Sequence, residues 1–133
     1  MEANEVQALL KDLLPDHLGF QLTRTEPDHV EAHVTVRKEL CTGGDIMHGG
    51  ALMALADTVG ACGALVNLET NQGTTTLESK TNFFSAAPIG ETVIAISRPL
   101  HRGKRTQVWQ TDIRTETGKL VAQVTQTQMT LGA

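Results

Sequence analysis

One carboxylate stands alone in the longest apolar stretch of the chain. Asp57 is the only charged residue between Gly49 and Leu68, where small and aliphatic residues dominate. A segment that is apolar nearly all round has no polar face to give to water, so it is predicted to be a buried helix. An unpaired buried carboxylate is costly, and such groups in clefts are candidates for acid–base or nucleophilic chemistry. Alternatively, Asp57 bonds a nearby hydroxyl or amide and only fixes packing.

The tripeptide His48-Gly49-Gly50 stands at the start of this segment. The start of a helix offers free backbone N–H groups and the positive end of the helix dipole, and glycine allows a ligand to approach closely. Such a place suits a carbonyl oxygen that gains negative charge during a reaction. A glycine-rich turn that merely leads into a helix is the alternative, and the tripeptide alone does not decide between them.

The spacing of Gly49 and Asp57 has a geometric consequence. Eight residues at about 1.5 Å each place them about 12 Å apart along one helix axis. One helix therefore cannot bring both groups to the same reacting carbon. Two antiparallel copies related by a two-fold axis would place Gly49 of one copy opposite Asp57 of the other. The spacing predicts a site shared between subunits, with two sites per dimer.

The elements that position these residues follow from periodicity and turn residues. A short amphipathic helix is predicted over Val6–Leu14, ended by Pro15, and two extended segments between Gly19 and Val36 are separated at 26–28. A loop covers 37–47. After the central helix, four alternating, β-branched segments with turn-forming separators are predicted to be strands, at 74–84, 92–98, 106–115 and 120–130. They indicate an antiparallel meander, with the helix against one face of one sheet.

Composition limits the possible functions. A chain of 133 residues fits one domain, covering 1–133. The net charge of -4 and an aromatic content of 3% without tyrosine argue against nucleic-acid binding. The apolar stretch 51–68 is almost long enough to span a bilayer, but Asp57 near its centre argues against a membrane protein.

Cysteine and histidine spacings give no metal or disulfide motif. Cys41 and Cys62 form no C-x-x-C pair, which favours a reducing cytoplasm without disulfides. Cys41 has no base beside it in sequence, which argues against a cysteine nucleophile. His29 and His33 lie four apart on a predicted strand with no further ligand. No metal site is therefore expected.

The residues Met47–Leu52, followed by Leu55–Thr58, resemble the signature of hotdog-fold thioesterases of the phenylacetate-degradation and 4-hydroxybenzoyl-CoA thioesterase type. The resemblance runs from the loop before His48 to Met129, and includes the segments 83–91, 102–106 and 118–122. It implies an α+β hotdog fold, an antiparallel β-sheet wrapped around a long central α-helix. It also implies hydrolysis of an aryl- or aliphatic acyl-CoA by a homodimer or homotetramer, with no cofactor besides the CoA of the substrate.

The resemblance implies four candidate catalytic residues. The Gly49 amide would polarise the thioester carbonyl, and Asp57 of the neighbouring subunit would act as general base or nucleophile. Thr76 matches a serine or threonine that orients the water or the carboxylate, although it could be an ordinary strand threonine. His48 is expected to orient the backbone of the loop.

The substrate-binding residues implied by the resemblance are less uniform. Relatives often carry Asn or Gln where this chain has Thr42, which puts one polar contact to the thioester in question. The basic residues of the 102–106 turn would meet the phosphates of CoA, or else form a solvated hairpin tip. The candidate substrate-binding residues are Thr42, Gly50, Phe83, Arg102, Lys104 and Arg105.

Two alternative functions remain open at this point. A hotdog enoyl-CoA hydratase or dehydratase would need a catalytic histidine–carboxylate pair, which His48 and Asp57 could imitate. A non-catalytic acyl-CoA-binding protein would need no carboxylate inside the helix.

Overall fold

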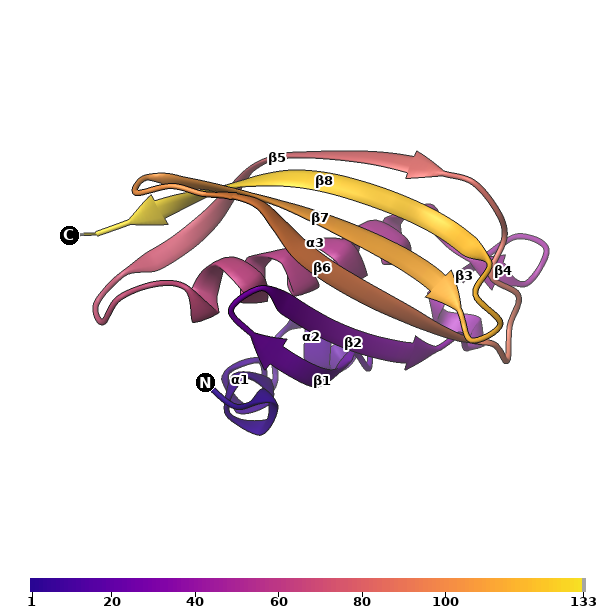
Figure 1. The fold of residues 1–133 in the computed structure, drawn as a ribbon. Coiled ribbons are helices and arrows are strands. Elements are labelled where there is room, and N and C mark those ends of the chain that lie inside the picture. Colours follow the sequence, from indigo (N-terminus) through magenta and orange to yellow (C-terminus); the bar gives the residue numbers. More distant parts are fainter. Residues whose placement is uncertain (133) are drawn as a thin grey trace.

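The computed structural model describes residues 1–132, and a curved six-stranded antiparallel sheet dominates it (Figure 1). The strands lie in the order β1-β2-β6-β7-β8-β5. Their bounds are β1 (Gln21–Glu26), β2 (His29–Thr35), β5 (Gly73–Phe83), β6 (Thr92–Arg102), β7 (Thr106–Thr115) and β8 (Leu120–Leu131). The break expected at 26–28 is the tight turn between β1 and β2.

The predicted central helix is α3 (Gly49–Val66), and the sheet curves around it (Figure 1). One face of α3 is buried against the strands, through residues such as Leu52, Leu55 and Val59. Close contact is possible because the helix is rich in small residues. At Gly63, an added Cβ would lie 2.7 Å from the ring of the fully buried Trp109. The expected arrangement of one helix on one face of one sheet is confirmed.

The predicted N-terminal helix over Val6–Leu14 is wrong in its extent, because this region forms two short helices, α1 (Ala3–Leu9) and α2 (Leu14–His17). Asp12 separates them with a φ of 67°, in the left-handed region, and its N–H donates to Asp16 Oδ2 at 2.9 Å. Pro15 does not end a helix. It lies in the first turn of α2, where a missing N–H and a fixed φ are tolerated.

The predicted four-strand meander is wrong for its first strand. β6, β7 and β8 are successive neighbours, but β5 lies at the far edge of the sheet and pairs with β8. The eight residues 84–91 are long enough to pass the ends of two strands spaced about 4.8 Å apart. The Met47 N–H holds this connection through a 2.8 Å hydrogen bond to the Ala87 carbonyl.

Two further boundaries differ from the sequence predictions. The loop expected over 37–47 contains a 3₁₀ turn (Lys38–Leu40) and a two-stranded ladder of β3 (Cys41–Thr42) and β4 (Ile46–Met47). β6 continues beyond Arg98 to Arg102, with a bulge between Pro99 and His101. Pro99 is tolerated because the ladder between β2 and β6 ends at Ser97, so no β2 partner needs its missing N–H.

Among residues 1–132, α3 is the one helix long and apolar enough to cross a membrane by length and composition. The same properties are found in core helices of folded domains, and α3 packs against the sheet in that way. A cytoplasmic location stays a prediction.

Candidate active site

The start of α3 has one unused backbone donor. His48 caps the helix: its Nδ1 accepts the Gly50 N–H at 2.7 Å, and its carbonyl accepts the N–H groups of Ala51 and Leu52. Within residues 1–132 the Gly49 N–H makes no hydrogen bond. An accepting Nδ1 carries no proton, so this cap needs the neutral imidazole. The amide of Gly50 is occupied by the cap, whereas that of Gly49 is available to a ligand.

A hollow of about 310 Å³ opens beside this free amide. It brings together three of the sequence-predicted residues, Thr42, Gly49 and Phe83, and the walls continue with Leu52 and Phe84. A Cβ on Gly49 would lie 3.3 Å from the Phe83 ring, so the ring packs against the helix start. Phe83 and Phe84 remain more than half exposed. The hollow is therefore an open, mostly apolar surface with one free N–H donor at its edge.

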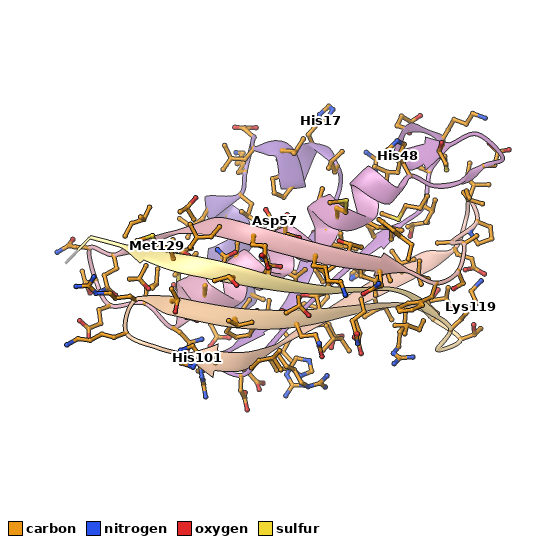
Figure 2. All side chains as sticks on the ribbon, turned by 90° about the horizontal axis from the view of Figure 1, so that it is seen from above. His17, His48, Asp57, His101, Lys119 and Met129 are labelled. Atoms are coloured by element: carbon orange, nitrogen blue, oxygen red, sulfur yellow. The ribbon has the colours of Figure 1, made fainter. Side chains whose placement is uncertain are left out.

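Asp57 lies in the middle of α3, away from the helix start at His48 (Figure 2). Its Oδ1 accepts a 2.7 Å hydrogen bond from the Thr76 hydroxyl on β5 and a 3.3 Å bond from Gln126 Nε2 on β8. Among residues 1–132 its Oδ2 has no hydrogen-bond partner. Thr76 and Asp57, two of the predicted catalytic residues, are thus in contact. Among the residues described, one carboxylate oxygen is held and the other is open.

Two buried glutamines complete this cluster, and sequence reasoning missed both. Gln126 and Gln128 are 0% and 1% exposed. Gln126 Nε2 donates to Gln128 Oε1 at 2.9 Å, and the Thr76 hydroxyl lies 2.6 Å from the same oxygen. The signal that could have found them is the period of two in β8, because Gln126 and Gln128 share the inward face with Val124.

The predicted phosphate-binding residues lie at the opposite end of α3. Arg102 Nη1 donates to the Pro27 carbonyl at 3.1 Å and to Oδ1 of Asn67, the C-cap of α3, at 3.3 Å. Lys104 and Arg105 follow in the β6–β7 turn and line a separate hollow. The 18 residues of α3 span about 27 Å, so one chain does not bring this turn to Gly49.

Comparisons with known proteins identify the family of the chain. A family model described as the thioesterase superfamily matches residues 44–122, which is more than half of the chain. The chain belongs to the thioesterase superfamily. The matched segment includes the whole of α3 and the strand that carries Thr76.

Curated relatives of this thioesterase carry related names. It is 31% identical over 106 residues to the proofreading thioesterase EntH of Cronobacter turicensis, covering 80% of this chain and 77% of the relative. It is 32% identical over 109 residues to 1,4-dihydroxy-2-naphthoyl-CoA hydrolase of Escherichia coli, covering 82% and 74%. The protein is therefore a thioester hydrolase.

The fold of the thioesterase matches solved structures closely. A thioesterase from Haemophilus influenzae superposes with a TM-score of 0.94 at 28% identity, over 99% of this chain and 92% of that one. The hotdog fold expected from the resemblance is confirmed.

The two cysteines of the thioesterase are poor nucleophile candidates in this structure. Burial, with the charge of Asp57 as a second cause, raises the pKa of Cys62 to about 12, so it stays a thiol near neutral pH. Cys41 Sγ donates to the Arg37 carbonyl at 3.3 Å. Residues 1–132 contain no group of three or more metal-ligating side chains. The catalytic role of the Asp57 carboxylate stays a prediction.

Proposed function

We propose that this thioesterase hydrolyses an acyl-CoA to the free acid and CoA, with Asp57 as general base or nucleophile. The observation that carries the proposal is the asymmetric carboxylate. Oδ1 is held by Thr76 and Gln126, and Oδ2 has no partner among the described residues, in a helix that is otherwise uncharged. An oriented carboxylate with one open oxygen can take a proton from water or attack a thioester carbon. The name of the Escherichia coli relative supports a CoA ester as substrate.

In the second part of the proposal, the Gly49 N–H binds the carbonyl oxygen of the thioester. This N–H makes no hydrogen bond with any of residues 1–132 and stands at the positive end of the α3 dipole. As the carbonyl becomes tetrahedral, its oxygen gains charge, and a fixed N–H donor stabilises that charge. Thr42 and Phe83 line the same hollow and would contact the acyl group or the thioester.

The two halves of this site come from different subunits. Along one α3 the Gly49 amide and the Asp57 carboxylate are separated by about 12 Å. β5 is an edge strand, so one side of its backbone is free to pair, and its Leu77 is 57% exposed. We place a second copy across a two-fold axis beside β5 and α3, so that Gly49 of each copy faces Asp57 of the other.

The same pairing gives the basic turn a role. If Gly49 faces Asp57 of the partner subunit, the end of the partner's helix lies nine residues, or about 13 Å, beyond Gly49. Its β6–β7 turn lies at that end, with Arg102, Lys104 and Arg105. Guanidinium and ammonium groups bind phosphate. The extended pantetheine arm of CoA can span this distance, so the turn would bind the nucleotide of CoA.

A hydratase or dehydratase reaction is less compatible with this arrangement. It needs a histidine paired with a carboxylate, but His48 Nδ1 is committed to the Gly50 N–H. Asp57 is bonded to threonine and glutamine instead. Crotonyl-CoA is a direct control, because hydration removes the absorbance of the enoyl group and hydrolysis releases a free thiol.

The test is a panel of acyl-CoA thioesters with detection of the free thiol. We expect Asp57→Ala to lower kcat by at least about a hundredfold, the effect of losing a positioned acid–base group. Asp112→Ala is the matched control, since this β7 carboxylate accepts a hydrogen bond from Gln123 and has no contact with the cluster. Equal turnover by Asp57→Ala and wild type would refute the assigned role.

A further inference from the structure

Hydrophobic packing does not explain why two buried positions on β8 carry glutamine. Ala122 and Val124, earlier on the same inward face, are apolar and fully buried. Gln126 and Gln128 then place two amides in the same layer. A buried amide is costly unless its hydrogen bonds are made, and an aliphatic side chain of similar size would avoid this cost. Both amides point to one place, the Asp57–Thr76 contact.

Gln126 contacts Asp57 twice. Its Nε2 lies 3.3 Å from Asp57 Oδ1 and 3.4 Å from the Asp57 carbonyl oxygen. The same nitrogen is therefore close to both the side chain and the backbone of one residue. A donor in this position restricts rotation of the carboxylate about its side-chain bonds. It also keeps Oδ1 on the inner side, so that Oδ2 is the oxygen left for chemistry.

Gln126 is held through its Nε2 by a second glutamine and packs closely against the helix, whereas its Oε1 accepts no hydrogen bond among residues 1–132. Gln128 Oε1 accepts from Gln126 Nε2 at 2.9 Å, and Gln128 Nε2 donates to the Thr74 hydroxyl at 3.1 Å. On the helix side, Gln126 lies against Gly60, where an added Cβ would be 2.8 Å from Nε2 and closer still to Oε1. Gly60 thus provides the space through which a β8 side chain reaches Asp57.

We propose that Gln126, anchored by Gln128 and given room by Gly60, is a positioning residue that fixes the orientation of the Asp57 carboxylate. This inference rests on the proposed role of Asp57. Thr76 and Gln126 donate to the same oxygen from different strands, and two donors define an orientation that one donor leaves free. Misplacing a reacting group by about 1 Å can cost about a hundredfold in rate.

The first experiment is Gln126→Met, which keeps the length of the side chain and removes its donor. We expect kcat to fall by about ten- to a hundredfold with KM within about twofold of wild type, because orientation of the carboxylate matters in the chemical step. Gln107→Met is the matched control. Gln107 is 3% exposed on β7 and bonds Trp109 Nε1 and the Ala64 carbonyl, but not Asp57.

A purely structural role would give a different pattern. Gln107→Met and Gln126→Met both lose buried hydrogen bonds, so both should lower the urea midpoint, whereas only Gln126→Met should lower kcat. If Gln126→Met does not fold, Gln128→Met removes the anchor instead and should give a smaller fall in kcat, again at constant KM. A kcat equal to that of the Gln107 variant would overturn the inference.

A double-mutant cycle separates this inference from the proposed function. If Gln126 acts through the carboxylate, then Gln126→Met should cause no further loss of kcat in an Asp57→Asn background. If the double variant instead lost kcat by the product of the two single losses, the positioning role of Gln126 would be overturned. An active Asp57→Asn enzyme would overturn the proposed function. An inactive Asp57→Asn enzyme beside a fully active Gln126→Met enzyme would overturn the inference alone.

Discussion

Replacing Gly49 by proline removes the proposed carbonyl-binding N–H and leaves the start of the helix intact. Gly49 is the first residue of α3, the position where proline is best tolerated. The residue before a proline must be extended, and His48 already has φ -63° and ψ 137°. The N–H groups that the fold uses here belong to Gly50, Ala51 and Leu52, so no intramolecular hydrogen bond is lost.

The size of the effect follows from the chemistry of the lost donor. Removing one N–H from a site that binds a developing oxyanion raises the barrier by about 2.7–4 kcal/mol, or about 10²–10³ in kcat. Global stability should change little, because Gly49→Pro keeps the His48 cap and reduces the freedom of the unfolded chain. The variant therefore combines a large loss of turnover with a nearly unchanged unfolding midpoint.

Gly49→Ala controls for the added bulk. A Cβ at this position lies 3.3 Å from the Phe83 ring in either variant, but alanine keeps the N–H. Thiol release from an acyl-CoA substrate and urea unfolding would be measured for both variants. We expect Gly49→Ala to remain within about tenfold of wild type, as for a steric contact worth under about 1.4 kcal/mol. Similar turnover by Gly49→Pro and Gly49→Ala would refute the role of the amide.

Two further results are expected. Subunits carrying Asp57→Ala are refolded with an equal amount of subunits carrying Gly49→Pro. The mixture should recover about a quarter of wild-type activity, because half of the dimers are mixed and each mixed dimer holds one intact site out of two. No recovery would contradict a shared site. Burial raises the pKa of Cys62 from 9.0 to about 12. Between these pH values the thiol of the folded chain keeps its proton, whereas the thiol of the unfolded chain loses it. Stability should therefore fall as pH rises from 9 towards 12, with a steeper loss of urea midpoint in wild type than in Cys62→Ala; parallel curves would contradict this.

The sequence predicts those parts of the structure that depend on a single residue or on a short pattern of neighbouring residues. An apolar run with a glycine start predicts the central helix, and the resemblance pointed to Thr76 as a residue that orients the water or the carboxylate. Helical spacing predicts a single N-terminal helix, but the left-handed φ of Asp12 divides the segment into two. Proline suits the first turn of a helix as well as the position after its end, so Pro15 alone does not show where a helix stops.

The local sequence pattern does not predict the order of the strands across the sheet. The position of β5 beside β8 depends on pairings between residues that are about fifty apart in the chain, such as Thr76 with Gln128. Gln126 reaches Asp57 across 69 positions, and only the space at Gly60 makes that contact possible. Such contacts depend on the assembled fold. The sequence therefore identifies the Asp57 carboxylate as a candidate but does not identify Gln126 and Gln128, which support it.

The two faces of α3 are consistent with the proposal that one chain forms only half of each site. The helix buries Leu52, Leu55 and Val59 against the sheet, and this face stabilises the fold. Asp57 lies off that face, with Oδ1 bonded inwards and Oδ2 without a hydrogen-bond partner in the part of the chain that the structure describes. A second such helix, running the opposite way, would bring its Gly49 amide to the open oxygen without disturbing the buried face. Under this proposal the buried face of α3 stabilises each subunit, and association of two subunits would complete the carboxylate site.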